Sequence, residues 1–136
     1  VIGIDRESAM LAEARVRPDL ASNIEFIEGD ALKLPIKDGT SDIAMFCLVL
    51  HHIEDATSAV AEAGRVIKKG GRILIIDMQK HIRDEYRHTM GHVHLGFSEE
   101  DLQAIAATVG LKVDRYQKLN PDTNASGPSL FVALLS

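Results

Sequence analysis

Short apolar runs alternate with segments of helical spacing along the whole chain. An apolar run bounded by turn residues predicts a strand. The predicted strands are Val1–Ile4, Ile24–Ile27, Ile43–Leu50, Arg72–Ile76, Leu111–Leu119 and Ser129–Leu135. Apolar or small residues that recur every three or four positions predict helices that begin near Ser8, Asp55 and Ser98. Strands that alternate with helices at short intervals predict an α/β fold with a mostly parallel sheet.

Two of the predicted strands, Ile43–Leu50 and Arg72–Ile76, are apolar at nearly every position. Strands that are apolar on both faces are typical of a parallel sheet that helices cover on both sides. We therefore expect these two strands at the centre of the sheet, with helices over both faces. No helical pattern separates Leu111–Leu119 from Ser129–Leu135, which predicts a C-terminal antiparallel hairpin.

Capping residues mark the ends of the predicted helices. Ser8 and Asp55 are candidate N-caps, and Ser98 opens a capping box with Asp101 three residues later. The Lys68–Gly71 segment places two cations and then two glycines after the second helical pattern. Because cations favour a helix C-terminus and glycine ends helices, this segment predicts the end of the second helix.

Composition limits the protein's class and its partners. The 136 residues are 46% hydrophobic and 26% charged, which predicts a single globular domain over residues 1–136. The net charge of −5, from 20 acidic and 15 basic residues, gives no basic footprint for nucleic acid. No apolar stretch is long enough for a membrane span, and we expect a cytoplasmic protein. The single cysteine, Cys47, lies in an apolar run, where we expect it to be buried and reduced.

Two stretches together carry a resemblance to a known family. They are VIGID at Val1–Asp5 and the segment Asp30–Ile76, which contains CLVLHHI at Cys47–Ile53. The sequence resembles the class I S-adenosylmethionine-dependent methyltransferases, in particular the group acting on small molecules and quinones. The resemblance implies a Rossmann-like, doubly wound sheet, S-adenosylmethionine as cofactor and a small-molecule acceptor. Because the family opens with a strand and a glycine-rich loop that would precede Val1, we expect this chain to be a fragment that lacks its first strand.

The resemblance assigns cofactor-binding roles to several residues. Asp5 follows a strand, where an acid in doubly wound folds accepts hydrogen bonds from ribose hydroxyls, although a helix-capping role is the alternative. Arg6 beside it is grouped with the same site. Asp30 is implied near the adenine amine, with the Ala31 N–H near a ring nitrogen, and a simple turn is the alternative. The backbone carbonyls of Cys47 and Leu48 are implied to accept from the cofactor's amino group.

Six histidines invite a catalytic or a metal-binding role. His51 is the candidate catalytic residue, to position a substrate or accept its proton, because imidazole titrates near neutral pH. For both His51 and His52 the alternative is a structural bond to a loop carbonyl. The residues implied to line the acceptor pocket are His52, Tyr86, His92, His94 and Phe97. The spacings among the later histidines fit no single regular element, so we expect no metal site.

The sequence is compatible with three functions. The first is an S-adenosylmethionine-dependent methyltransferase, of which this chain is the larger part. A non-catalytic methyltransferase-like binding or assembly module is the second, and a different nucleotide-binding α/β protein is the third. Arsenic as acceptor is disfavoured, because Cys47 is the single thiol and we expect it to be buried. An absent central strand predicts either a homo-oligomer formed through Val1–Asp5 or Ile43–Leu50, or direct pairing of these two strands within one chain.

Overall fold

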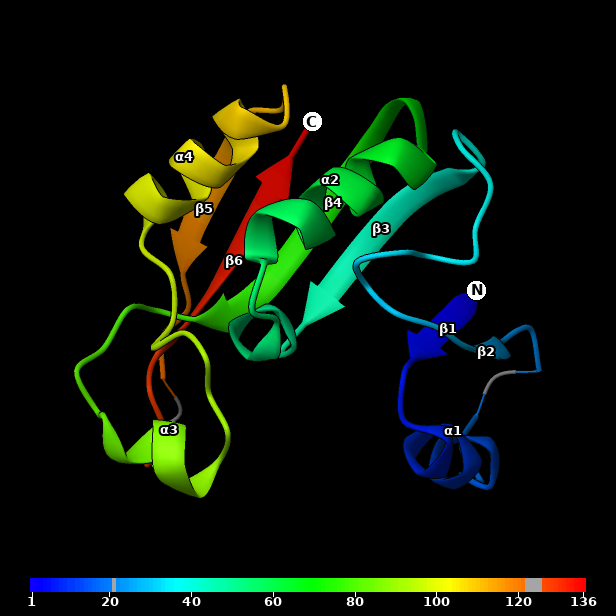
Figure 1. Ribbon diagram of the computed structural model, residues 1–136, viewed down its shortest axis with the longest axis horizontal. Coiled ribbons are helices and arrows are strands. Elements are labelled where there is room, and N and C mark those ends of the chain that lie inside the picture. The colour runs from blue at the N-terminus through cyan, green and yellow to red at the C-terminus, as the bar shows by residue number, and fades with distance from the viewer. Residues whose placement is uncertain (21, 122–125) are drawn as a thin grey trace.

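The computed structural model describes residues 1–20, 22–121 and 126–136. Its strands and helices follow the alternation expected from the sequence (Figure 1). The strands are β1 (Ile2–Asp5), β2 (Glu25–Glu28), β3 (Ser41–Cys47), β4 (Ile67–Met78), β5 (Val113–Lys118) and β6 (Leu130–Leu135). The α-helices are α1 (Ser8–Arg15), α2 (Ala56–Val66), α3 (Glu85–Thr89) and α4 (Glu99–Thr108), and η1 (Leu50–His52) is a 3₁₀ turn. None of the described helices is long and apolar enough to cross a membrane.

The strands form two sheets. β1 pairs in parallel with β2, and a separate four-stranded sheet has the order β3-β4-β6-β5. In the larger sheet β3 runs parallel to β4, whereas β6 runs antiparallel to both β4 and β5. The predicted C-terminal hairpin is therefore confirmed. The predicted alternative of direct pairing between Val1–Asp5 and Ile43–Leu50 is wrong, because β1 pairs with β2 in the separate sheet.

The two strands expected at the centre of the sheet have different positions. Arg72–Ile76 lies in β4, between β3 and β6, which confirms its central place. The expectation for Ile43–Leu50 is wrong, because β3 is the edge strand of its sheet, and the chain leaves the strand after Cys47. Ile43 and Met45 are 62% and 61% exposed. An apolar run does not itself specify an edge or a centre, since burial also depends on which neighbours are present.

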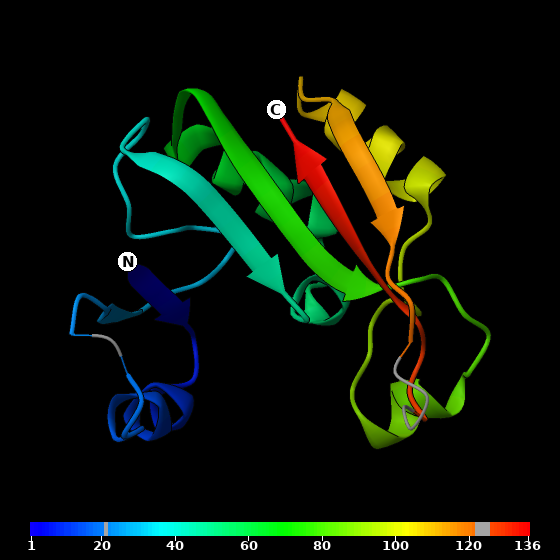
Figure 2. The same ribbon diagram turned by 180° about the vertical axis from the view of Figure 1, so that it is seen from behind.

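Helices cover one face of the larger sheet. Figures 1 and 2 show α2 and α4 on the same side, with the opposite face turned to the viewer in Figure 2. The expectation of helices over both faces of this sheet is therefore wrong for the part of the chain that the structure describes. On the open face, Met45 of β3, Leu74 of β4 and Leu134 of β6 form one cross-strand row of apolar side chains.

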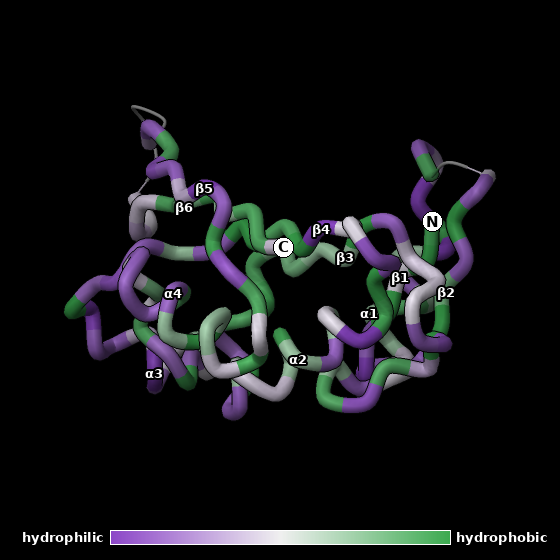
Figure 3. Tube along the Cα trace, turned by 90° about the horizontal axis from the view of Figure 1, so that it is seen from above, coloured by the Kyte–Doolittle hydropathy of each residue, from purple (hydrophilic) through white to green (hydrophobic). Residues whose placement is uncertain are grey.

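The hydrophobic core lies between the larger sheet and its two covering helices. Alternate residues of β4 and β6, such as Ile73, Ile75 and Phe131, are fully buried against Val60 of α2 and Leu102 of α4. The period of two follows from the strand geometry, in which successive side chains point to opposite faces. Figure 3 shows apolar positions gathered along β3, β4 and β6 and polar positions along the outer loops.

Local side-chain bonds fix where the helices start. Asp55 caps α2 by accepting from the Ser58 N–H at 2.9 Å, and Ser98 forms the predicted capping box with Asp101. The prediction of Ser8 as an N-cap is wrong, because Glu7 occupies that position and no side-chain bond caps α1.

The end of the second helix differs from the prediction. α2 ends at Val66, and Lys68–Gly71 belongs to β4, so these cations do not lie at a helix C-terminus. The backbone N–H groups of Gly39 and Thr40 donate to the carbonyls of Arg65 and Val66. These bonds satisfy the last carbonyls of α2 and allow the chain to turn directly into the strand.

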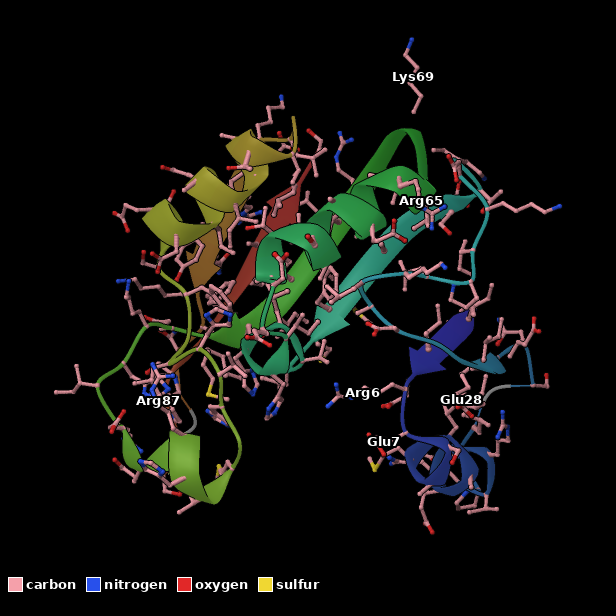
Figure 4. All side chains as sticks on the ribbon, viewed as in Figure 1. Arg6, Glu7, Glu28, Arg65, Lys69 and Arg87 are labelled. Atoms are coloured by element: carbon pink, nitrogen blue, oxygen red, sulfur yellow. The ribbon has the colours of Figure 1, made fainter. Side chains whose placement is uncertain are left out.

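Arg65 joins α2 to the loop before β3. Its guanidinium donates to both carboxylate oxygens of Glu62, to Asp38 and to the carbonyls of Leu34 and Ile36 (Figure 4). Glu62 in turn accepts from the Leu34 N–H at 3.0 Å. The hydrogen bond from Arg65 lowers the pKa of Glu62 below its ordinary value. This network fixes the path by which the chain passes from the small sheet to the large one.

Candidate functional site

The carboxyl ends of β1, β3 and β4 point in the same direction (Figure 1). In open α/β sheets, ligands bind outside the carboxyl ends of the strands. Most of the predicted site residues follow these strand ends or lie in the loops beside them. They fall into two groups, one at the small sheet and one at the large sheet.

Two carboxylates lie at the end of the small sheet. Asp5 ends β1, and Asp30 comes two residues after the end of β2. The Gly29 N–H donates to the Asp5 carbonyl at 3.0 Å, which links the two strand ends. One oxygen of Asp5 accepts from the Glu7 N–H and one oxygen of Asp30 accepts from the Leu32 N–H, each at 2.8 Å. The second oxygen of each carboxylate can accept donors from a ligand.

The neighbours of these carboxylates differ in exposure. Arg6 is exposed, its Nε lies 3.6 Å from a carboxylate oxygen of Glu7, and it extends out of the β1–α1 loop in Figure 4. Ala31 is half-buried and packs against the edge of the hydrophobic core. These positions agree with local turn roles for Asp5 and Asp30 and are also compatible with a ligand. The predicted roles of Arg6 and Ala31 in cofactor binding stay predictions.

The end of β3 has an unusual backbone. Leu48 has φ +53°, a left-handed conformation that a branched side chain rarely adopts, and its N–H donates to the Ile76 carbonyl at 2.8 Å. This turn leads the chain out of β3 into η1. The expectation that Cys47 is buried is wrong: its side chain is exposed. Burial of Cys47 therefore gives no reason against a reactive thiol. The predicted contacts of the Cys47 and Leu48 carbonyls with the cofactor stay predictions.

A buried hydrogen-bonded pair lies at the end of the large sheet. His51 of η1 and Asp77 of β4 are 2% and 0% exposed, and His51 Nδ1 lies 2.6 Å from Asp77 Oδ1. Asp77 also accepts from the His51 N–H at 3.3 Å and from the Met78 N–H at 2.7 Å. Since a carboxylate only accepts, Nδ1 of His51 is the donor and Nε2 is the nitrogen left for a ligand.

Backbone bonds hold a second loop against this pair. The His51 carbonyl accepts from the N–H groups of Val93 and His94 at 3.1 and 3.0 Å. His52 Nδ1 lies 3.2 Å from the Gly91 carbonyl, which can accept a hydrogen bond from it. The loop between α3 and α4 is therefore fixed to η1 from both sides. This arrangement places His92 beside His51 and His52.

The three rings form a cluster. Centroids lie 4.1 Å apart for His51 and His52, 4.4 Å for His51 and His92, and 5.1 Å for His52 and His92. His92 is 5% exposed, and its Nδ1 is buried with no hydrogen-bond partner among the described residues. Burial first, and then the neighbouring His51 and His52, lower the pKa of His92. Tyr86 of α3 lies against the cluster, with its ring centroid 5.3 Å from that of His92.

The remaining two candidates for the acceptor pocket have structural contacts. Phe97 is 4% exposed within the hydrophobic core, and its N–H donates to the Met78 carbonyl. His94 Nε2 lies 3.0 Å from the Ile53 carbonyl, so His94 anchors a loop. Before Phe97, Gly96 has φ +77° and lies so close to Gln79 that a Cβ would overlap its backbone. This close approach holds the loop on the end of β4.

Sequence reasoning missed Asp77, the partner of His51. The signal was present, since Asp77 directly follows the apolar run Arg72–Ile76 and His51 follows the neighbouring run Ile43–Leu50. Polar residues after adjacent parallel strands meet at one edge of a sheet. The proximity of His92 had no such signal, because it depends on how the loop before α4 folds back over η1.

The two groups provide different chemistry. Carboxylates such as Asp5 and Asp30 accept hydrogen bonds from hydroxyl and amine groups of a ligand. The His51–Asp77 pair can hold an imidazole in one tautomer, which suits proton transfer. Both groups lie at the same edge of the fold, where the strands β1, β3 and β4 end.

Comparisons with known proteins agree with this architecture. A family model described as a methyltransferase domain matches residues 1–75. The chain is 35% identical over 79 residues to a demethylmenaquinone methyltransferase of Lactococcus lactis, covering 57% of this chain and 31% of that protein. It is 29% identical over 122 residues to a ubiquinone/menaquinone biosynthesis C-methyltransferase of Idiomarina loihiensis, covering 88% and 47%. The chain thus spans less than half of the length of these relatives.

Solved structures show the same fold. An S-adenosylmethionine-dependent methyltransferase from Mesorhizobium loti superposes with a TM-score of 0.77 at 17% identity, over 99% of this chain and 79% of that one. One from Methanosarcina mazei gives a TM-score of 0.75 at 20% identity, over 99% and 80%. The Rossmann-like α/β fold and the family resemblance are both confirmed. The chain therefore belongs to the methyltransferase-domain family and has the fold of its class I, S-adenosylmethionine-dependent members.

Proposed function

We propose that the protein containing this chain transfers a methyl group from S-adenosylmethionine to a small-molecule acceptor that loses a proton, of which a reduced quinone is the first candidate. The observation that carries the proposal is the shared edge of the fold, with Asp5 and Asp30 on one side and the His51–Asp77 pair on the other. The quinone class is suggested by relatives whose names include demethylmenaquinone methyltransferase.

On the cofactor side, the two carboxylates have complementary tasks. Asp5 accepts hydrogen bonds from the ribose hydroxyls, since it retains one oxygen beyond its bond to the Glu7 N–H. Asp30 accepts from the adenine amine, and its turn with Leu32 holds the carboxylate in place. S-adenosylmethionine supplies an electrophilic methyl group on a sulfonium. Because this donor is already activated, holding the acceptor in line provides much of the rate acceleration.

On the acceptor side, His51 receives the proton. Asp77 holds its Nδ1–H at 2.6 Å, so Nε2 has the free lone pair. When bound, S-adenosylmethionine would supply the methyl group: its methyl–sulfur bond would break and leave the electron pair on sulfur as the acceptor's carbon or oxygen bonded to the methyl carbon. The acceptor then has one proton fewer, which passes to Nε2 of His51. Such general-base assistance contributes about 10²–10⁴-fold to a rate.

The test uses the protein that contains this chain, radiolabelled S-adenosylmethionine and a panel of reduced demethylated naphthoquinones. Transfer of label to an acceptor, with formation of the demethylated cofactor, is the expected result. Asp5→Ala should weaken cofactor binding by about 1.5–3 kcal/mol, or roughly 10–150-fold in Kd, through loss of charge-assisted hydrogen bonds.

Glu13→Ala is the control, because Glu13 is an exposed acid on the neighbouring α1. Calorimetric titration should give it the wild-type Kd. An unchanged Kd in Asp5→Ala would show that Asp5 does not contact the ribose. Absence of both cofactor binding and transfer would favour the alternative of a non-catalytic binding module.

A further inference from the structure

The cluster of His51, His52 and His92 provides nitrogen ligands that the proposed methyl transfer does not require together. One ring nitrogen from each residue lies within 4.8 Å of the other two. His51 and His52 belong to η1, which follows the end of β3, and His92 lies in the loop between α3 and α4. We propose that these three histidines bind a divalent transition-metal ion of the zinc class.

The hydrogen bonds of the cluster favour metal binding. His51 Nδ1 donates to the Asp77 carboxylate at 2.6 Å, and His52 Nδ1 lies 3.2 Å from the Gly91 carbonyl. In zinc sites, a ligating histidine almost always donates its other ring N–H to a carboxylate or a backbone carbonyl. Both rings therefore have the second contacts of metal ligands, with Nε2 left free.

His92 provides the independent observation. Its Nδ1 is buried, has no partner among the described residues and belongs to a side chain that is 5% exposed. A buried polar atom without a partner costs free energy. A metal ion bound through Nδ1 of His92 would satisfy this nitrogen, whereas an apolar acceptor would leave it without a partner.

The geometry requires a modest adjustment. Zinc–nitrogen bonds of about 2.0–2.1 Å bring tetrahedral ligand nitrogens to about 3.4 Å from one another. The nitrogens, now up to 4.8 Å apart, must therefore approach one another by up to about 1.4 Å. His52 is exposed, so its side chain can move to shorten these distances. The hydrogen bonds from the Val93 and His94 N–H groups to the His51 carbonyl keep His92 in place.

The donor set points to the class of metal. Imidazole suits zinc, copper, iron and nickel, whereas magnesium and calcium prefer oxygen ligands. Three protein ligands leave one position of a tetrahedral zinc ion for solvent or another oxygen, as in catalytic zinc sites. The sequence offered no metal motif because two ligands lie in η1 and the third lies forty residues later, in the loop before α4.

The test measures metal binding without cofactor or acceptor, so its outcome is independent of the proposed function. The chain is prepared without a histidine tag, stripped with a chelator, and titrated with zinc by calorimetry and by equilibrium dialysis with elemental analysis. One zinc per chain is expected. His52→Ala and His92→Gln should each weaken zinc binding by at least about tenfold, and Asp77→Asn by about 10–100-fold.

His88→Ala is the matched control, because His88 is an exposed histidine of α3 outside the cluster. It should bind zinc as the wild type does. His52 is exposed, so its variant tests the site even if the buried His92 variant does not fold. Circular dichroism checks each fold. Failure of the wild type to bind zinc, or equal zinc binding by folded His52→Ala and the wild type, would overturn the proposal.

Discussion

Burying the carboxylate of Asp77 and the ring of His51 removes both from water, and only close mutual contacts make this tolerable. Asp77 accepts from His51 Nδ1, from the His51 N–H and from the Met78 N–H. These bonds take the place of the lost hydration, and removing one partner of such a buried pair costs about 3–5 kcal/mol. Burying such a pair adds little net stability, which agrees with the functional role that we propose for it at this edge of the fold.

The same nitrogen, Nε2 of His51, has a part in both proposals. Zinc bound there would remove the lone pair that accepts the acceptor's proton. We therefore predict that zinc inhibits methyl transfer by the protein that contains this chain and that a chelator restores it. Initial rates measured against free zinc should fall with the same midpoint as zinc binding.

The His88→Ala control should keep the zinc sensitivity of the wild type, because His88 lies outside the cluster. Loss of activity on treatment with the chelator would contradict this prediction. In that case His51 would be a ligand of an activating metal and not the proton acceptor.

Single residues show the limits of prediction from the sequence. Asp5 and Asp30 could be found because each follows a strand, and His51 because it follows the end of an apolar run. Their proximity to other side chains was harder to predict. Asp77 was missed, and Cys47 was expected to be buried although its strand lies at the sheet edge. Exposure and pairing depend on neighbours distant in sequence, which local patterns do not encode.

Among the elements, α4 has the best-defined start. Ser98 accepts from the Asp101 N–H at 3.1 Å, and Asp101 accepts from the Ser98 N–H at 2.9 Å. We predict that Ser98→Ala lowers the free energy of unfolding by about 1 kcal/mol, because it leaves a helix N–H without its cap. Urea denaturation gives the value.

Ser8→Ala is the matched control. Ser8 begins α1 but makes no capping bond. Its substitution should leave the urea midpoint nearly unchanged. Equal losses in the two variants would mean that the capping box of α4 contributes nothing beyond serine's general effect.

The Arg65 network predicts how stability depends on pH. The hydrogen bond from Arg65 lowers the pKa of Glu62 from its ordinary value of 4.5. A carboxyl group with a lowered pKa in the folded state stabilises the fold above its unfolded pKa, and this contribution is lost as pH falls through the folded pKa. We predict that the Tm of the wild type falls on acidification below about pH 4.5. The Tm of Arg65→Met should fall less over the same pH range, because without Arg65 the pKa of Glu62 in the folded state lies nearer its ordinary value.

Thermal denaturation between about pH 3 and pH 7 tests this, with Arg17→Met as control. Arg17 is exposed, and its Nε lies 3.6 Å from a carboxylate oxygen of the exposed Asp19. Such surface pairs contribute little, so the control should follow the wild-type curve. If Tm fell equally with decreasing pH in the Arg65 and Arg17 variants, the Arg65 network would not be the cause of the acid sensitivity.

The elements themselves were largely predictable, and their surroundings less so. The strand and helix order follows from local periodicity, and the caps at Asp55 and Ser98 follow from residue chemistry. The start of β4 at Ile67 was missed because two lysines and two glycines resemble a helix end. Backbone bonds from Gly39 and Thr40 end α2 earlier, and no local pattern reveals them.

In the whole molecule, α1, β1 and β2 form a unit beside the larger sheet, and β1 does not continue that sheet. The larger sheet is covered by α2 and α4 on one face only (Figures 1 and 2). The α/β class could be predicted because alternation is local. The gap in pairing between β1 and β3 could be foreseen only from the family resemblance, because the family has a further strand between these two.

This architecture leaves β3 with an unpaired edge and an apolar face. Ile43 and Met45 project from it, 62% and 61% exposed. A flat, apolar edge strand is a template for pairing with another chain. We therefore predict that the 136-residue chain self-associates through β3. Light scattering across a dilution series should show a mean mass that rises with concentration.

Charge on the edge strand should prevent this association. The double variant Ile43→Lys and Met45→Lys is expected to stay monomeric, because lysine on an edge strand opposes pairing. Ile82→Lys is the control: Ile82 is 96% exposed but lies in a loop outside the strands, so that variant should associate like the wild type. A wild-type chain that stays monomeric at high concentration would contradict the prediction. Association that persists in the folded double variant would place the contact elsewhere, with the β1 edge as the next surface to test.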